Sequence, residues 1–248
     1  MRRLTLSIVG MSFVACAATS VATPPSPTIA TTIADARGTL AQASTARSPA
    51  GPLYVSIVET DMGRAGAITE QREPGFELVL AGSERIRVGT ASPISVGGGQ
   101  AVFVQGDAVT RFESDGIAVS YFVSLRPAAS RSRTFTAGRR ALYESTDLPL
   151  AATPAGRYLD ALVLLVLQPG AVVPPHMHGG IEPTYVIEGM IELKVAGRPA
   201  EHLGPGGGDT VLPDTPLLIT NVGSTVARVL VMLATPEGRP VQSSASPP

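Results

Sequence analysis

The sequence predicts an all-β protein that consists of two tandem barrels behind a disordered N-terminal tether. Glycine and proline are abundant, with 26 and 22 of the 248 residues. Short apolar runs are separated by turn residues roughly every eight to twelve positions, as in antiparallel sandwiches and barrels. The first half of the chain also resembles the second half, which indicates a tandem repeat. With 44% hydrophobic residues, the chain is able to bury a large core.

The internal repeat has a nearly constant spacing. Gly63 and Gly82 recur about 107 residues later as Gly170 and Gly189. Three further segments match at a similar spacing: residues 48–51 with 153–156, residues 99–107 with the turn at Gly207, and residues 117–125 with 226–234. Each half is therefore expected to form one barrel.

Two of the three histidines lie in the segment GAVVPPHMHGGIEPTYVIEG, which runs from residue 170 to residue 189. His176 and His178 are two positions apart, so they leave the same face of an extended strand. Two glycines then let the backbone turn back before Glu182. Two imidazoles and a carboxylate at one point form the ligand set that octahedral non-haem Fe(II) favours, and Mn, Ni, Co and Zn also accept it. The alternative is that two surface histidines flank a methionine near an ordinary glutamate.

The spacing of this segment resembles the first signature motif of the cupin superfamily. Gly170 is followed by five residues, the His-x-His pair, three residues, Glu182, six residues and Gly189. The resemblance covers residues 158–236 and implies a small antiparallel barrel of the jelly-roll, or double-stranded β-helix, type. It also implies that the motif histidines and glutamate point into the mouth of that barrel. The motif is specific for fold and metal, and it leaves the reaction open.

The second cupin motif is incomplete. The Gly-Asp turn at residues 208–209 and Asn221 match it, whereas Leu217 or Leu218 stands where a fourth ligand histidine is usual. Because leucine cannot coordinate a metal, the motifs supply at most three protein ligands. An open coordination position suits substrate or dioxygen binding, but a missing ligand also weakens metal binding. The third histidine, His202, is expected to face outward, and a role as replacement ligand is the alternative.

The first half of the chain lacks the metal motif. At the spacing of the repeat, Thr69, Gln71 and Gly75 occupy the three ligand positions. These residue types form no competent ligand set, so the N-terminal barrel is expected to be a metal-free copy. Carboxylates without nearby histidines mostly face solvent. Three glutamates of this region are therefore expected on the surface: Glu70, Glu73 and Glu77.

Six parts are expected along the chain. Residues 23–49 consist mainly of Ala, Thr, Ser and Pro, which bury too little surface to offset the entropy of ordering, although a weak helix near residues 32–45 is an alternative. The expected parts are a signal peptide (1–22, or 1–15 for a lipoprotein signal), a disordered linker (23–49), a degenerate cupin barrel (50–128), a connector (129–152), a cupin barrel with the metal motif (153–236) and a disordered tail (237–248).

The first residues are typical of a bacterial export signal. Two arginines precede an apolar run of about a dozen residues, which is too short to span a bilayer stably. Cleavage is expected either before Cys16, which would then carry a lipid, or after Ala22. The protein is therefore predicted to be periplasmic or a membrane-anchored lipoprotein, with membrane contact only through a lipid on Cys16. Since Cys16 is the only cysteine, no disulfide forms within the chain.

Charge and motif content argue against several function classes. The net charge is −1 and no basic cluster lies outside residues 126–140, so nucleic acid is not an expected partner. The sequence also has no nucleophile elbow and no phosphate-binding loop, which disfavours hydrolase chemistry of that kind and nucleotide binding.

The resemblance implies one divalent transition metal per chain, Fe, Mn, Ni or Zn, held by His176, His178 and Glu182. The favoured function is a metal-dependent dioxygenase, or an isomerase or lyase, that acts on a small organic molecule, with Glu182 as the catalytic base. The alternative is a non-catalytic cupin that binds or senses a small molecule with weak metal binding or none. A homodimer is expected from the resemblance alone.

Overall fold

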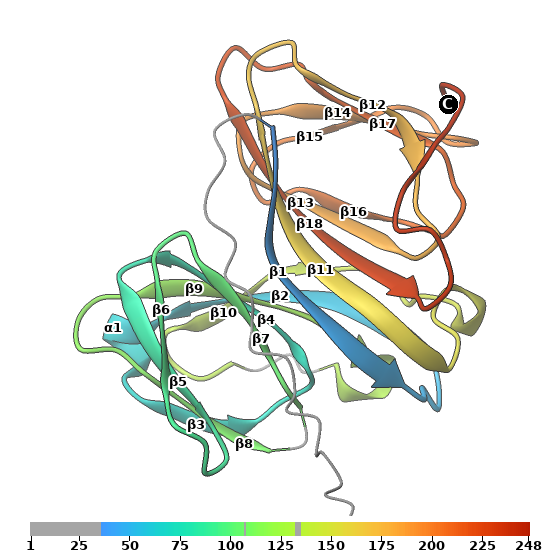
Figure 1. Ribbon diagram of the computed structural model, residues 1–248. Coiled ribbons are helices and arrows are strands. Elements are labelled where there is room, and N and C mark those ends of the chain that lie inside the picture. Colours follow the sequence, from blue (N-terminus) through green and yellow to red (C-terminus); the bar gives the residue numbers. More distant parts are fainter. Residues whose placement is uncertain (1–35, 107, 132–134) are drawn as a thin grey trace, which may run out of the picture.

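The computed structural model describes residues 36–248 except for residues 107 and 132–134, and nearly all of its regular structure is β-strand (Figure 1). The predicted signal peptide and the first part of the predicted linker lie outside the described residues. The longest helix among the described residues, α1 (Met62–Ala65), has four residues, so no described helix is long enough to cross a membrane.

The strands fall into two barrels and two additional strands. The N-terminal barrel contains β2 (Leu53–Asp61), β3 (Ile68–Gln71), β4 (Gly75–Ala81), β5 (Ser83–Val88), β6 (Ile94–Gly97), β7 (Ala101–Val104), β8 (Val109–Glu113) and β9 (Val119–Pro127). The C-terminal barrel contains β11 (Gly156–Leu167), β12 (Val172–Met177), β13 (Glu182–Glu188), β14 (Ile191–Val195), β15 (Glu201–Leu203), β16 (Gly208–Val211), β17 (Leu217–Asn221), β18 (Ala227–Pro236) and β19 (Ser243–Ser244). The additional strands are β1 (Ala36–Arg47) and β10 (Arg139–Glu144). Short 3-10 helices occupy Ala128–Ser130 and Leu150–Ala152.

Each barrel is a pair of antiparallel sheets. The N-terminal barrel has the strand orders β10-β2-β9-β4-β7 and β3-β8-β5-β6. The C-terminal barrel has the orders β1-β11-β18-β13-β16 and β15-β14-β17-β12-β19. The predicted all-β class with two tandem jelly-roll barrels is therefore confirmed.

The two barrels repeat one another in detail. A β-bulge interrupts β4 and β13 at corresponding positions, and the glycine after each bulge has a positive φ, 74° at Gly82 and 81° at Gly189. A Cβ at Gly82 would lie 2.1 Å from the carbonyl oxygen of Ile117, and a Cβ at Gly189 would lie 2.5 Å from the Cα of Ala227. Only glycine fits these turns, which explains why glycines occur at this spacing in both halves of the sequence.

Residues 36–47 are neither disordered nor helical, so the prediction of a disordered linker is wrong for this part. They form β1, which pairs with β11 from Ala36 opposite Val166 to Arg47 opposite Gly156. The connector contributes in the same way, because β10 pairs with β2. The strand ahead of each barrel thus completes the other barrel. The amino-acid composition of these segments does not reveal that they pair with the other barrel, because the pairing uses backbone groups at open strand edges.

Polar contacts anchor the end of β1. Oδ2 of Asp160, a fully buried residue of β11, accepts hydrogen bonds from Oγ1 of Thr45 and from Nη2 of Arg47, each at 2.6 Å. The guanidinium of Arg47 also lies over the ring of Tyr158, 4.2 Å from its centroid. Since a buried carboxylate is costly without a positive partner, Arg47 links the position of β1 to the stability of the C-terminal barrel.

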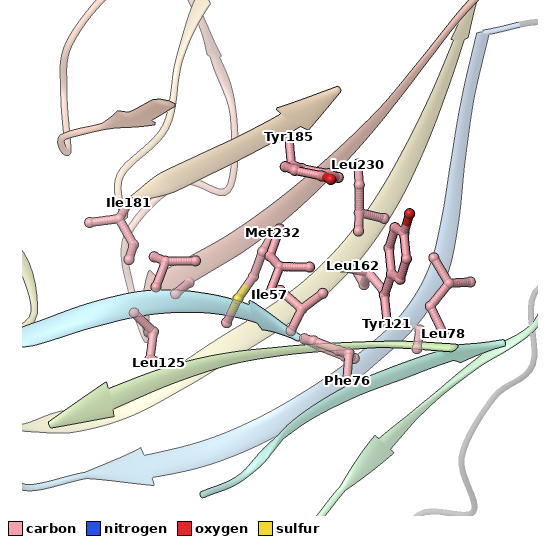
Figure 2. Packing of buried hydrophobic residues seen from close by; sticks show 14 of the residues in the cluster. Ile57, Phe76, Leu78, Tyr121, Leu125, Leu162, Ile181, Tyr185, Leu230 and Met232 are labelled. Atoms are coloured by element: carbon pink, nitrogen blue, oxygen red, sulfur yellow. The ribbon is translucent and has the colours of Figure 1, made fainter. Parts of the chain in front are cut away.

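The facing sheets of the two barrels share one hydrophobic core (Figure 2). Ile57, Phe76 and Tyr121 of the N-terminal barrel pack in the same cluster as Leu162 and Met232 of the C-terminal barrel. Each barrel also has an interior core of its own. Because each large apolar side chain contributes about 1.5–3 kcal/mol when it is buried, the contact between the barrels is a major source of stability.

Charged side chains occupy the interior of the N-terminal barrel, which corrects the prediction that its glutamates face solvent. Glu77 is buried, with 1% of its surface exposed, and its Oε2 lies 3.0 Å from Nη1 of Arg72. Arg72 also pairs with the partly buried Glu70. The guanidinium of Arg72 lies against the rings of Phe112 and Phe122, 3.9 and 4.3 Å from their centroids. An ion pair thus compensates the buried carboxylate.

A second carboxylate, Glu84, is also buried in this barrel, with 1% of its surface exposed. Burial raises the pKa of Glu84 to about 7, the charge of Glu77 adds to the shift, and Ser120 and Arg72 oppose it. Burial likewise raises the pKa of Glu77, against the charge of Arg72. The folded protein therefore holds the Glu84 proton more tightly than the unfolded chain does.

Arg47→Ala is expected to destabilise the protein by about 3 kcal/mol, because the buried carboxylate of Asp160 loses its cation. Arg157→Ala is the matched control, since its ion pair with Glu237 is exposed (70% and 66% of the side chains) and contributes about 1 kcal/mol or less. Urea denaturation measures both free energies of unfolding. Equal effects of the two substitutions would contradict the anchoring role of Arg47.

Glu84→Gln is expected to flatten the pH dependence of stability. In the wild type, the free energy of unfolding falls as the pH rises from 4.5 to about 7, because the unfolded chain releases the Glu84 proton first. Glu84 accounts for a decrease on the order of 3 kcal/mol in the free energy of unfolding across this pH range. The glutamine variant lacks this decrease because the glutamine side chain does not ionise. Urea denaturation at several pH values across this window measures the effect. Parallel pH profiles of the two proteins would argue against a raised pKa.

Candidate metal centre

The three predicted ligands, His176, His178 and Glu182, lie together inside the C-terminal barrel. Their potential ligand atoms are all within 4.8 Å of one another. Oε2 of Glu182 lies 3.0 Å from Nε2 of His178 and 3.9 Å from Nε2 of His176. The imidazole rings are nearly perpendicular, at 88°, with centroids 5.0 Å apart. No other group of this kind occurs among the residues that the structure describes.

β12 and the glycine turn after it place these side chains. One histidine lies on β12 and the other directly follows the strand, and both are buried. A Cβ at Gly180 would lie 2.0 Å from the carbonyl oxygen of Ala234. The missing side chain lets the turn pass close to β18, so the chain reaches Glu182 at the start of β13.

A backbone carbonyl accepts a hydrogen bond from each histidine at Nδ1, the ring nitrogen that does not face Glu182. Nδ1 of His176 donates to the carbonyl of Pro174 at 2.7 Å, and Nδ1 of His178 donates to the carbonyl of Val241. Because a carbonyl oxygen only accepts, Nδ1 of each ring carries a proton, and in the neutral form of the ring Nε2 faces Glu182 as an electron-pair donor. Metal-bound histidines have the same arrangement.

The donor set fits a cation. Only 4% of His176, 5% of His178 and 2% of Glu182 is exposed. Among the described residues, no N–H or O–H group donates to the buried Oε2 of Glu182, and no lysine or arginine pairs with it. Burying a carboxylate is costly unless a positive charge or hydrogen-bond donors compensate it, and a bound cation would do so here. Two imidazoles and one carboxylate therefore suit a divalent transition metal.

β17 supplies no fourth ligand. Leu217 lies opposite His176 in the pairing of β12 with β17, and Ile219 lines the same cavity as the ligands. Side chains alternate along a strand, so Leu218 points to the other face. Of the two leucines at the predicted position of a fourth histidine, Leu217 is therefore the one on the side of the ligands.

A cavity of about 200 Å³ adjoins the three ligands. Its wall consists mainly of apolar side chains from β11, β12, β17 and β18, and it is completed by Thr39 of β1 and by Val241 and Gln242. A second cavity of about 490 Å³ lies beside His176 and shares Gln242. Segments from both ends of the described chain thus complete the site.

Residues 237–245 make backbone hydrogen bonds with the C-terminal barrel, in contrast to the predicted disorder of residues 237–248. β19 pairs with β12 and places Ser244 opposite His176 and Ser243 opposite Met177. The sequence did not predict that this segment lies beside the candidate ligands. Its Ser- and Pro-rich composition carries no strand signal, because backbone groups make the pairing.

The remaining histidine lies outside the centre. His202 on β15 has 61% of its side chain exposed, and its Nε2 is 3.8 Å from Oε2 of Glu192. The outward orientation expected from the sequence is therefore observed, and the alternative role as replacement ligand is not supported.

The corresponding positions of the N-terminal barrel carry other residues. Thr69 and Gln71 lie on β3, and Gly75 begins β4 where Glu182 begins β13. A Cβ at Gly75 would lie 2.5 Å from the carbonyl oxygen of Val123, so the backbone leaves no room for a carboxylate there. The two barrels thus share a fold and differ in the chemistry of their interiors.

Comparisons with known proteins agree with this architecture. Residues 163–233 match the family model of the cupin domain. A comparison with curated proteins found no match to the sequence.

Three solved structures share the two-barrel fold. Oxalate decarboxylase from Lactobacillus farciminis, solved as a formate complex, is 10% identical with a TM-score of 0.54, and the match covers 88% of this chain and 91% of that chain. AerE from Microcystis aeruginosa is 12% identical with a TM-score of 0.51 and coverage of 85% and 97%. Oxalate decarboxylase from Bacillus subtilis, which has Mn(II) centres, is 12% identical with a TM-score of 0.54 and coverage of 86% and 80%. Identities this low show the fold alone, and the match to the family model identifies residues 163–233 of the C-terminal barrel as a cupin domain.

Proposed function

We propose that the C-terminal barrel binds one divalent transition metal, Fe, Mn, Ni or Zn, through His176, His178 and Glu182. The observation that carries this proposal is the approach of two imidazole nitrogens to a buried carboxylate oxygen that no described N–H or O–H group serves. The Mn(II) centres of the Bacillus subtilis oxalate decarboxylase support it at the level of the fold.

The proposed activity is that of a metal-dependent dioxygenase, or of an isomerase or lyase, on a small organic molecule. The bound metal supplies a Lewis acid and a template for the oxygen atoms of the substrate. The apolar wall of the cavity of about 200 Å³ excludes water and limits the substrate to a small molecule. Thr39 and Gln242 offer polar contacts that orient it, and Glu182 is the carboxylate placed to take a proton from it.

A second candidate function is the non-catalytic binding or sensing of a small molecule, with weak metal binding or none. Leu217 and Ile219 favour this function, because apolar side chains occupy the side of the centre where β17 would bring a fourth ligand. The two functions differ in the metal content of the purified protein.

Protein purified without a His tag is expected to contain about one equivalent of Fe, Mn, Ni or Zn per chain, as measured by elemental analysis. His176→Ala is expected to reduce this content about tenfold or more, because two ligands alone hold a metal weakly. The matched control is His202→Ala, which removes an exposed histidine and should keep the metal. A metal-free wild type whose thermal stability equals that of His176→Ala would favour the binding or sensing function instead.

We also propose that the protein is exported and is either periplasmic or anchored through a lipid on Cys16. Residues 1–35 lie outside the described part of the chain, so this proposal is based on the sequence. Mass spectrometry of the mature protein is expected to find a lipidated Cys16 at the N-terminus or, after conventional cleavage, Thr23. A mature protein that still begins at Met1 would contradict export.

A further inference from the structure

Residues 239–245, which we call the closing segment, run alongside the strand that carries the metal centre. The end of the chain lies beside β12 (Figure 1). The backbone N–H of Gly179 donates to the carbonyl of Pro240 at 2.9 Å, and the N–H of Ala245 donates to the carbonyl of Pro175 at 3.3 Å. Between these two contacts, β19 pairs with β12. The closing segment is therefore attached at both of its ends to the metal motif.

One contact of the closing segment reaches a ligand directly. The carbonyl of Val241 accepts the hydrogen bond from Nδ1 of His178, from a position 63 residues later in the chain. Nδ1 of His176, in contrast, is bound by the carbonyl of Pro174, only two residues away. The hydrogen bond at Nδ1 of one ligand is thus local to β12, whereas the hydrogen bond at Nδ1 of the other comes from a distant segment.

On the basis of the proposed metal binding, we propose that the closing segment is part of the metal centre and that the Val241 carbonyl positions His178 for the metal. The carbonyl keeps the proton on Nδ1, so Nε2 presents its electron pair 3.0 Å from Oε2 of Glu182. Without this acceptor, the ring is free to rotate and to carry its proton on Nε2, where it blocks coordination. The effect is large because Leu217 leaves the motifs with only three ligands.

The first test is a pair of truncations of the full chain. Removal of residues 240–248 is expected to weaken Mn(II) binding about 10- to 100-fold, as loss of the hydrogen-bond partner of a ligand typically does. Removal of residues 246–248 is the matched control, because all the contacts of the closing segment with the metal motif remain. Titration with Mn(II) followed by electron paramagnetic resonance gives both dissociation constants. Equal affinities would overturn the proposal.

A second variant displaces the closing segment without deleting it. A Cβ at Gly179 would lie 2.7 Å from the carbonyl oxygen of Pro240, so Gly179→Ala is expected to push the segment away and to weaken Mn(II) binding in the same direction. Gly204→Ala is the matched control, since a Cβ there meets no atom within 4 Å. Ser243→Ala keeps the backbone pairing of β19 and the Val241 carbonyl, and it should leave the affinity nearly unchanged. A loss in Ser243→Ala as large as in the truncation would overturn the role of the carbonyl.

A direct measurement does not depend on the metal. In metal-free protein with ¹⁵N-labelled histidine, the ring nitrogens of His178 are expected to show a proton on Nδ1 in the wild type and a shift toward Nε2 in the protein without residues 240–248. An unchanged tautomer, with or without a loss of Mn(II) affinity, would overturn the positioning role. If the wild type fails to bind Mn(II), the metal function fails, and the tautomer still decides whether Val241 positions His178.

Discussion

Backbone pairing at open strand edges is the constraint on which the rest of this protein depends. An edge strand exposes unpaired N–H and C=O groups, and segments outside the core of each barrel cover them here: β1 covers β11, β10 covers β2 and β19 covers β12. Two of these segments also reach the candidate metal centre, because β1 brings Thr39 to the cavity wall and the chain before β19 brings Val241 to His178. The same hydrogen bonds thus protect the sheets and complete the site.

Both barrels bury a carboxylate, and they compensate its charge in different ways. In the N-terminal barrel, Arg72 supplies the positive charge next to Glu77. In the C-terminal barrel, Glu182 has two imidazoles beside it and no lysine or arginine among the described residues. The cost of burying a carboxylate is the same in both places, and the proposed metal would offset it in the second barrel.

The N-terminal barrel also packs against the strand that begins the candidate metal centre. β13 begins with Glu182 in the centre and, three residues later, places Tyr185 in the core shared by the barrels. The ring of Tyr185 meets that of Tyr121 edge to face, with centroids 6.1 Å apart at 82°. The strand that carries the carboxylate ligand is therefore held on one face by the barrel that lacks the motif.

The sequence by itself determined the all-β class, the two repeated barrels and the three side chains of the candidate centre, because each of these depends on local spacing: glycines at the turns, alternation along strands, and His-x-His followed by a glycine turn and a glutamate. Only the tertiary structure decided that residues 36–47 and 243–244 are strands, that Glu77 lies inside a barrel, and that Leu217 rather than Leu218 faces the ligands. These features depend on which distant backbone edge or charged group a segment meets. Composition reports how much apolar surface a segment is able to bury, but it does not report whether an unpaired strand edge lies within reach.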